Sequence, residues 1–236
     1  MSHFPAALAR CFAAVVCAAA ALLLGGCFSS LKHDPTHYYV LSEVSNIPVL
    51  NSDGTPRPDP PKRPKTPLHV NVVLPVYLDR TELVLRPSEN RLDMRETELW
   101  LEPPAKACAR VFARDLAARL GTEQTSTGLS GAPPRDGLLV SLDVSRFDGT
   151  PRRGVILRAR WRVTLVQNGT TLSTGEREVI VSAANIQKPS AGSAAEPDSP
   201  GTGENAVHAN YVRAMSEALG QFSHIVAEEV SRVTKE

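Results

Sequence analysis

The sequence is poor in aromatic residues and has no excess of either charge. Aromatic side chains make up 5% of its 236 residues, and 26 basic residues stand against 25 acidic ones, for a formal net charge of +1. Single-stranded nucleic acids bind by stacking on aromatic side chains, and nucleic acids in general select basic surfaces. The composition therefore argues against a nucleic acid partner. The hydrophobic share of 42% is that of a globular protein with its own core.

Cysteine is also scarce, and two of the four cysteines lie in one apolar run near the N-terminus. Residues 11–24, which follow Arg10, are uninterrupted apolar residues. As a helix this run spans about 21 Å, which is less than the ~30 Å hydrocarbon core of a bilayer. The run is therefore predicted to be the apolar region of a signal peptide and not a membrane-spanning helix.

The apolar run ends in Leu24-Gly25-Gly26-Cys27. Small residues directly before a cysteine resemble the lipobox of bacterial lipoproteins, in which the cysteine sulfur is acylated and the signal is cleaved just before it. We therefore predict a signal peptide over residues 1–26, a lipidated tether over residues 27–36 and a stable lipid anchor at Cys27. The alternative is a plain secretory signal in which the cysteine occupies this place by chance.

Cleavage before Cys27 has two consequences for the rest of the chain. Cys108 is then the only free thiol, so neither an intramolecular disulfide nor a CxxC metal or redox site is expected. The nine residues 28–36 separate Cys27 from His37, and they reach about 30 Å when fully extended. The folded domain is therefore expected to lie close to the membrane surface.

Residues 37–236 are predicted to form a single domain that contains two irregular segments. Residues 47–67 include seven prolines and are expected to form an extended connection. Residues 187–205 contain no large apolar residue and are predicted to be a disordered insertion.

Apolar periodicity predicts two main helices and several strands in this domain. The predicted strands are 37–41, 68–74, 82–86, 91–95, 138–144, 155–167 and 170–181, and the predicted helices are 103–120 and 206–233. Pro103 suits the start of the first helix and Gly121 its end. The apolar stripe of the second helix is interpreted as core packing, with partner binding as the alternative. Strands separated by a helix indicate an α/β or α+β domain with a mixed sheet and two covering helices.

The dipeptide Asn168-Gly169 is a strong signal for a hairpin between the last two predicted strands. A plain two-residue loop would place Arg160 opposite Arg177, which is a poor match. We therefore predict one extra residue, as a β-bulge at Thr174-Gly175. This bulge would pair Arg162 with Glu176, Arg160 with Glu178 and Ala159 with Val179.

Motifs for catalysis or metal binding are not found in the sequence. It has no GxSxG, P-loop, dinucleotide-binding or HExxH motif, and none of its six histidines forms an H-x-H pair. Asp79 and Glu82 are close in sequence, but a surface turn is a simpler interpretation than an acid–base pair. No catalytic residue, metal site or cofactor is therefore predicted.

Three arginines, Arg158, Arg160 and Arg162, lie on the polar side of one predicted strand. Guanidinium groups bind phosphate well, so this stripe is a candidate site for lipid headgroups. The alternatives are a solvated face that pairs with Glu176 and Glu178, or a face that is covered by a neighbouring subunit.

Several segments carry motifs that occur together in one protein family. They are Tyr38-Tyr39-Val40-Leu41; Val73-Leu74-Pro75-Val76-Tyr77-Leu78-Asp79-Arg80 with Leu83, Val84 and Arg86, which is similar to an LPxYLDRxxLVxR signature; Asn90 with Leu99-Trp100-Leu101-Glu102-Pro103; and the C-terminal helix with Tyr211. From about residue 37 to residue 233 the chain thus resembles the PqiC-type family, the ABC-type transport auxiliary lipoproteins. Pro104 departs from the pattern, because the family usually has leucine there.

This resemblance implies a fold and a function. The fold would be a three-layer α/β/α domain similar to anticodon-binding domains. The protein would be a non-enzymatic lipoprotein of the outer membrane that faces the periplasm, belongs to an MCE-type lipid transport system and contacts its MCE-domain protein. Phe28, in place of aspartate after Cys27, fits export to the outer membrane in enteric bacteria. Ring-like homo-oligomers and contact with phospholipid are further expectations.

The resemblance also suggests where a partner or a second subunit would bind. The candidate interface residues are Tyr77, Leu78, Asp79, Arg80, Trp100 and Glu102, and core packing is the alternative role for Tyr77 and Trp100. Two other functions remain open at this point. One is a structural envelope lipoprotein that binds another envelope protein or peptidoglycan, and the other is a periplasmic hydrolase, which lacks a recognisable nucleophile and base.

Overall fold

A computed structural model describes residues 36–44, 55–62, 67–128, 131–182 and 204–234 of the chain. The predicted signal peptide, the lipidation at Cys27 and the tether up to residue 35 lie outside these residues, as do residues 187–203 of the predicted insertion. A compact unit extends from Thr36 to Glu236, and the description below concerns this unit alone.

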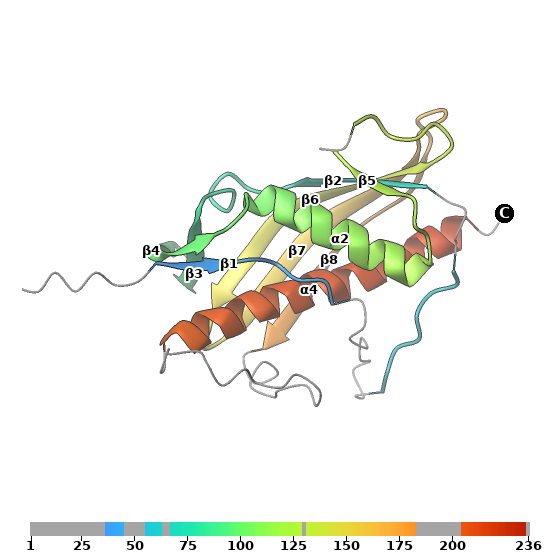
Figure 1. Cartoon of the computed structure of the whole chain (residues 1–236). Coiled ribbons are helices and arrows are strands. Elements are labelled where there is room, and N and C mark those ends of the chain that lie inside the picture. Colours follow the sequence, from blue (N-terminus) through green and yellow to red (C-terminus); the bar gives the residue numbers. More distant parts are fainter. Residues whose placement is uncertain (1–35, 45–54, 63–66, 129–130, 183–203, 235–236) are drawn as a thin grey trace, which may run out of the picture. The chain divides into compact units, whose positions relative to one another are not determined.

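The larger of two mixed sheets has the strand order β5-β2-β6-β7-β8 (Figure 1). Strand β2 is parallel to β5 and β6, whereas β6, β7 and β8 are antiparallel neighbours. The strands are β2 (Leu68–Val73), β5 (Thr125–Thr127), β6 (Leu138–Thr150), β7 (Gly154–Leu165) and β8 (Thr171–Ser182). The short β5 lies in a segment that the sequence predicts to be a loop.

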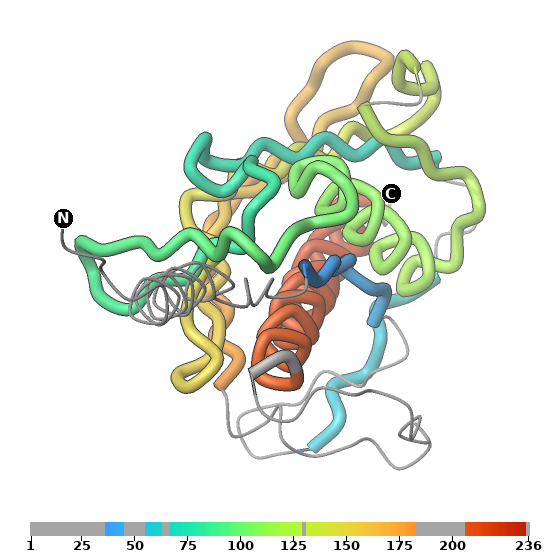
Figure 2. Tube along the Cα trace, turned by 60° about the vertical axis from the view of Figure 1, so that its left-hand side comes forward, coloured from blue at the N-terminus to red at the C-terminus, as the bar shows by residue number. Residues whose placement is uncertain are grey.

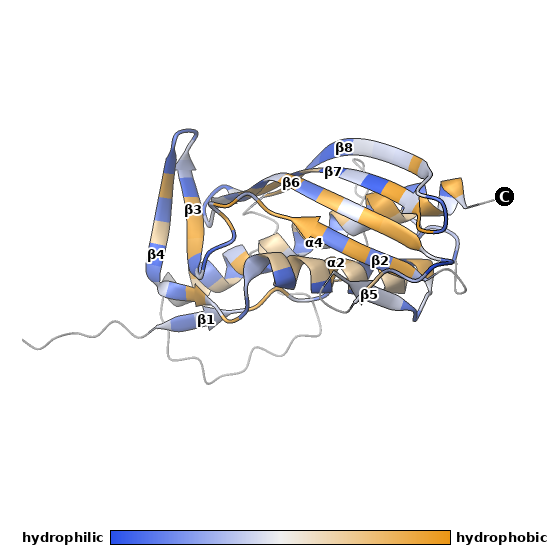
Figure 3. Ribbon diagram, turned by 90° about the horizontal axis from the view of Figure 1, so that it is seen from above, coloured by the Kyte–Doolittle hydropathy of each residue, from blue (hydrophilic) through white to orange (hydrophobic). Residues whose placement is uncertain are grey.

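A smaller, three-stranded sheet has the order β1-β4-β3 and stands at one end of the larger sheet (Figure 3). Its strands are β1 (His37–Tyr39), β3 (Glu82–Ser88) and β4 (Arg91–Trp100). Strands β3 and β4 form an antiparallel hairpin, and β1 is parallel to β4. These strands begin where the sequence predicts them, but β1 ends two residues early and β4 continues five residues beyond its predicted end, to Trp100. They also form a sheet of their own and not part of one common sheet.

The two helices are α2 (Pro104–Leu120) and α4 (Glu204–Val233). They lie side by side, and α2 packs on β2 and β5 while α4 packs on β7 and β8 (Figures 1 and 2). Helix α2 begins at Pro104, one residue later than predicted, with Pro103 as its N-cap, and it ends at Leu120 as predicted, followed by Gly121 in the left-handed conformation, φ +69°. Helix α4 begins two residues earlier than predicted, so Glu204 and Asn205 belong to it and not to the predicted disordered insertion.

The structure confirms the α/β class but differs from the expected three-layer arrangement. Both helices cover the same face of the larger sheet, and the opposite face is exposed along the middle of β7. Apolar and polar residues alternate along this strand (Figure 3). A strand with one apolar face packs against helices on that face only. The layers are therefore one sheet and one pair of helices.

The apolar stripe of α4 lies in the core from Tyr211 to Val230, which confirms its interpretation as a packing stripe, although its first residue, Val207, is exposed. Phe222 is fully buried between the two helices and the sheet, with its ring 6.5 Å from that of Phe112 and 6.0 Å from that of Trp161. Buried aromatic side chains in such edge or tilted contacts contribute strongly to stability. The other buried residues of the stripe are Tyr211, Met215, Leu219, Val226 and Val230.

The predicted β-bulge at Thr174-Gly175 is wrong. In the β7–β8 ladder Arg160 lies opposite Glu176 and Ala159 opposite Arg177, two residues away from the predicted pairing. The extra residue is Leu172, because the register changes between the pairs Val163–Ser173 and Thr164–Thr171.

The hairpin loop explains this difference in register. The backbone N–H of Leu165 donates to the carbonyl oxygen of Thr170 at 2.9 Å, so residues 166–169 form the loop. A two-residue type I′ turn needs positive φ at both central residues. Among the described residues only glycines have positive φ, so Gly169 at +72° meets this condition and Asn168 does not. The loop is therefore longer than the dipeptide predicts, and the register changes with it.

A second bulge, at Ser145, divides β6 into two halves. The ladder with β7 changes there from the pair Val144–Ala159 to the pair Arg146–Arg158. Because side chains alternate along a strand, one extra residue exchanges the faces of all residues that follow. Phe147 thereby points towards the helices, and Asp148 points to the opposite side. The period-two pattern that predicts the strand ends at residue 144 for this reason, although the strand continues to Thr150.

The proline strap, Thr55–Lys62, is the longest described part of the proline-rich segment, and it is hydrogen-bonded to both helices. Arg119 of α2 is 2% exposed, and its Nη1 donates to Asp59 Oδ1 of the strap at 2.9 Å. Lys62 Nζ donates to two carbonyl oxygens in the last turn of α2, each 3.0 Å away. Ser231 Oγ of α4 donates to a carbonyl oxygen of the strap at 3.0 Å. The extended connection is therefore part of the packed structure.

A buried histidine of α4 lies beside the proline strap. His224 Nδ1 accepts a hydrogen bond from Arg119 Nη1 at 3.3 Å, because a guanidinium can only donate. Its Nε2 lies 3.4 Å from Glu228 Oε1. Burial, and after it the charge of Arg119, lowers the pKa of His224, and Glu228 opposes this shift in part. His224 is therefore neutral in the folded protein at neutral pH.

Acid is expected to weaken the fold through His224. The unfolded chain binds a proton on this histidine near pH 6.5, whereas the folded chain binds it only at lower pH. Above this pH the histidine does not lower the free energy of unfolding. As the pH drops below it, the free energy of unfolding decreases by at most about 1.4 kcal/mol per pH unit. Urea unfolding between pH 8 and pH 5 measures this slope.

The matched variant for this test is His224→Gln, which removes the titrating group. Burial also lowers the pKa of His69, and this histidine contributes with the same sign in both proteins. The difference in slope between wild type and variant therefore isolates His224. Equal slopes for the two proteins would contradict the prediction.

Candidate functional site

Four of the six candidate interface residues line one surface groove. Asp79 and Arg80 reach it from the loop between β2 and β3, Trp100 from the end of β4, and Glu102 from the segment between β4 and α2. The groove has a volume of about 410 Å³ and is also lined by Thr81, Leu101, Pro103 and Pro104. Tyr77 and Leu78 belong to the same loop but are not part of this lining. The signature segment and the Leu99–Pro103 segment, far apart in sequence, thus meet at one place.

Asp79 caps the N-terminus of helix α2. Its Oδ1 accepts a hydrogen bond from the backbone N–H of Ala105 at 3.1 Å. The first N–H groups of a helix lack partners within the helix, and the N-cap residue Pro103 offers no side-chain acceptor. A carboxylate there satisfies one such group and interacts favourably with the helix dipole. The aspartate of the signature therefore has a structural role that the sequence does not reveal.

The capping role predicts a moderate loss of stability on replacement of Asp79. Asp79→Ala is expected to lower the free energy of unfolding by about 1 kcal/mol, since it removes the side-chain acceptor that the described residues provide at this helix start. The matched control is the exposed neighbour Arg80, whose contact with Glu82 at 3.4 Å contributes little. Urea unfolding compares the two. Equal stability of Asp79→Ala and Arg80→Ala would contradict the assignment of a cap.

Glu102 of the groove forms an ion pair with Arg110 of α2. The same guanidinium donates through Nη2 to the carbonyl oxygen of Leu41 at 3.2 Å. Glu102 thus helps to hold the chain that follows β1 against the first helix. Its carboxylate remains about one-third exposed, so it is also accessible to a partner at the groove.

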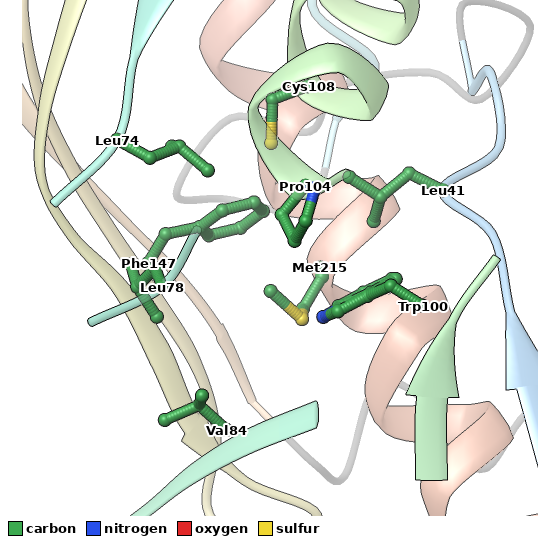
Figure 4. Close-up of a pocket in the computed structure, with 9 residues that line it drawn as sticks. All are labelled: Leu41, Leu74, Leu78, Val84, Trp100, Pro104, Cys108, Phe147 and Met215. Carbon is green, nitrogen blue, oxygen red and sulfur yellow. The ribbon is translucent and has the colours of Figure 1, made fainter. Parts of the chain in front are cut away.

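Leu78 and Trp100 point into a buried apolar cavity between the two sheets and the helices (Figure 4). Its volume of about 20 Å³ has room for roughly one water molecule, which its apolar walls do not favour. Burial raises the pKa of Cys108, another lining residue, to about 12, so its thiol is unreactive. The remaining lining residues are Leu41, Leu74, Val84, Pro104, Phe147 and Met215. This position favours a packing role for Leu78 and Trp100.

Tyr77 belongs to a buried charge cluster that is centred on Asp148. The Tyr77 hydroxyl donates to Asp148 Oδ2 at 2.9 Å. The Nε atoms of Arg86 and Arg146 lie 2.8 and 2.9 Å from Asp148 Oδ1. Asp148 is fully buried, and the Arg86 guanidinium lies 5.4 Å from the centre of the Tyr77 ring. Two residues of the signature, Tyr77 and Arg86, therefore converge on one carboxylate that the sequence analysis missed.

The cluster joins the two sheets and helix α4. Arg86 comes from β3 and Asp148 from β6, while Tyr211 of α4 donates its hydroxyl to the carbonyl oxygen of Val84 at 3.2 Å. Burial, with a further contribution from Asp148, raises the pKa of both tyrosines, so both hydroxyls are protonated donors. A buried carboxylate that is satisfied by two guanidinium groups and one hydroxyl stabilises a particular packing and is closed to a substrate.

Arg158, Arg160 and Arg162 are exposed on the open face of the larger sheet. Arg158 donates two hydrogen bonds to Glu178 Oε2, at 2.9 and 2.5 Å. Arg160 Nη2 donates to Glu176 Oε2 at 3.1 Å, and Arg162 lies opposite Thr174. Two of the three arginines thus have cross-strand carboxylate partners, as the solvated-face alternative expects, although in a different register.

Two further observations concern the described residues only. They contain no group of three or more histidine, cysteine, aspartate or glutamate side chains placed to bind a metal ion. Neither of the helices described above combines the length and hydropathy that are needed to cross a membrane.

Solved structures with low sequence identity share this fold. An uncharacterised protein is 16% identical and superimposes with a TM-score of 0.58 over 84% of this chain and 99% of its own. A Xanthomonas campestris protein of the DUF330 family is 12% identical, with a TM-score of 0.55 over 85% of this chain and 100% of its own. A search of curated protein sequences finds no match.

A family model identifies the protein family, which the fold alone does not. The model of the ABC-type transport auxiliary lipoprotein component matches residues 50–227, which include the signature loop, the charge cluster and most of α4. This match covers well over half of the sequence, from the proline-rich segment to the last helix. The chain therefore belongs to the ABC-type transport auxiliary lipoprotein family.

Proposed function

We propose that the protein is a non-catalytic outer-membrane lipoprotein that faces the periplasm and docks the MCE assembly of an ABC-type lipid transporter to that membrane. The observation that carries this proposal is the family match over residues 50–227. The Leu24–Cys27 sequence supports it, since it would supply the lipid anchor. The anchor and the folded unit would together form a membrane-bound receptor for the lipid-carrying part of the transporter.

The groove between Asp79 and Glu102 is the surface we propose for protein contact. It combines a basic, an acidic and an exposed apolar side chain, Arg80, Glu102 and Leu101, the last of which is 67% exposed. Such a mixture suits a transient protein interface with a polar rim. By contrast, the Asp148 cluster is enclosed, so its charges serve packing and not recognition.

Co-purification tests the proposed function. The full lipidated chain, extracted from membranes with mild detergent, is expected to carry an MCE-domain protein and phospholipid, both identified by mass spectrometry. Cell fractionation is expected to place the chain in the outer membrane, whereas Cys27→Ala, which can be neither acylated nor cleaved at this site, should not reach it. Recovery of only peptidoglycan-linked or unrelated envelope proteins would instead support a structural envelope lipoprotein.

A charge reversal in the groove tests the interface separately. Arg80→Glu is expected to reduce recovery of the MCE protein without unfolding the chain, because Arg80 is exposed and its ion pair is weak. The control is Arg152→Glu, which is exposed in the turn between β6 and β7. Equal recovery with both variants would exclude the groove as the docking surface and leave the family assignment unchanged.

A further inference from the structure

The outer face of β1 and β4 carries a row of exposed apolar side chains. Strand β1 pairs with β4 in parallel register, with Tyr38 opposite Leu99 and Tyr39 opposite Trp100. The backbone N–H of Leu101 donates to the carbonyl oxygen of Tyr39 at 3.0 Å, which continues the pairing by one residue. Tyr38, Val40 and Leu101 therefore follow one another on the same face, where they are 61%, 44% and 67% exposed.

The side chains on the inner face of the same strands are buried or hydrogen-bonded. The Tyr39 hydroxyl donates to Glu98, which also lies 3.3 Å from His37 Nδ1, and Trp100 is 6% exposed. The alternation of side chains along the strands thus fixes Tyr38, Val40 and Leu101 on the outside. Edge strands are commonly protected by charged side chains. At the β1 edge, apolar side chains occupy the outer positions instead.

The chain that precedes β1 limits what this row can face. His37 begins β1, and the nine residues 28–36 separate it from Cys27. Fully extended, they reach about 30 Å. If Cys27 carries acyl chains in a membrane, β1 is the strand that the tether holds nearest to that membrane. Of the other exposed apolar side chains, Ile180 lies on β8, at the opposite edge of the larger sheet from β5 and more than a hundred residues further along the chain.

We propose that Tyr38, Val40 and Leu101 form a lipid-contact face that rests on the headgroup layer of the membrane to which Cys27 is anchored. A tyrosine with two aliphatic neighbours suits the boundary between headgroups and acyl chains, because the ring is apolar and the hydroxyl stays hydrated. Shallow insertion of these side chains would add to the acyl anchor and fix the orientation of the domain. The inference rests on the proposed anchoring at Cys27.

This orientation would also place the groove at the membrane boundary. Leu101 belongs to both the lipid-contact face and the groove lining, to which Arg80 also contributes. Arg80 could then reach lipid phosphates, and a partner docked in the groove would be held beside the bilayer.

Site-specific fluorescence on the full lipidated protein tests the inference. Tyr38→Cys and Leu101→Cys are labelled one at a time with a polarity-sensitive dye, and Ile180→Cys is the matched control because Ile180 is similarly exposed, at 60%. Cys108 is buried and its thiol is unreactive, and Cys27 is blocked by acylation, so only the introduced cysteine reacts. The proteins are reconstituted into vesicles of phosphatidylethanolamine and phosphatidylglycerol, and flotation confirms that they are attached.

The expected result is a blue shift of the dye at positions 38 and 101, with quenching by spin-labelled lipids, and neither effect at position 180. Attached protein with no response at positions 38 and 101, or with the same response at position 180, would overturn the inference. A response at these positions only when an MCE protein is added would likewise overturn it, in favour of a protein partner. Failure of the wild-type chain to float would contradict the anchoring at Cys27, and thus the proposed function on which the inference depends.

Discussion

Replacing Asp148 with alanine is expected to destabilise the folded protein by about 3–5 kcal/mol. The substitution leaves Arg86 and Arg146 without their carboxylate, although their side chains are only 17% and 27% exposed. The Tyr77 hydroxyl loses its acceptor in the same step. A partly buried charge without a partner costs far more than the pair contributes when it is intact, which is why one truncation has so large an effect.

Urea unfolding of Asp148→Ala measures this effect, with Asp143→Ala as the control. Asp143 lies on the same strand but is exposed, so its replacement is expected to change the free energy of unfolding by less than about 0.5 kcal/mol. Similar losses in both variants would show that the cluster does not hold the sheets together. Tyr77→Phe should have a smaller effect, about 1 kcal/mol, because both guanidinium groups keep their carboxylate.

The substitution Gly149→Ala is expected to lower the free energy of unfolding by about 1–3 kcal/mol or more. A Cβ built at this position lies 1.9 Å from the carbonyl oxygen of Gly154 in the adjacent strand. That oxygen belongs to the backbone, so it cannot move aside as the end of a flexible side chain would. Gly149→Ala should therefore distort the β6–β7 ladder directly beside Asp148, which calorimetry or urea unfolding would measure.

The control for this substitution is another glycine with ordinary backbone geometry. Gly128 has no positive φ, and a Cβ there would meet only Asn71 Oδ1, at 3.4 Å. Gly128→Ala is therefore expected to be close to neutral. If the two alanine variants unfold alike, the close approach of the strands at Gly149 is not a constraint on the fold.

The sequence predicts most of the regular elements, because each of these has a local signal. The helical stripe of α2, its proline start and Gly121 at its end define that helix without reference to the rest of the fold. The alternating residues of β7 predict both the strand and its exposed arginine face. The three-residue β5 lacks such a signal, since Thr125–Thr127 has no apolar residue and becomes a strand only by pairing with β2.

What the sequence does not predict depends on contacts between distant segments. The bulge at Ser145 is visible only in the pairing with β7, and it decides on which side Asp148 lies. Tyr77 and Arg86 are recognisable as motif residues, but their common partner lies more than 60 residues away. The arrangement of the helices on one face of the sheet could not be predicted either. The pattern of an amphipathic helix indicates which of its own faces is buried, but not which face of a sheet it packs against.

The position of α4 has a consequence for the order in which the molecule can become folded. The last helix receives contacts from segments near the beginning of the described chain: Ser216 accepts a hydrogen bond from the backbone of Ser42, and Ser231 is bonded to the proline strap. Its central residue Phe222 completes the core under the sheet. The domain therefore cannot complete this core before these residues are available. If the predicted signal peptide directs the chain through a membrane, the domain would complete its fold only after α4 has emerged, which suits export through a narrow channel.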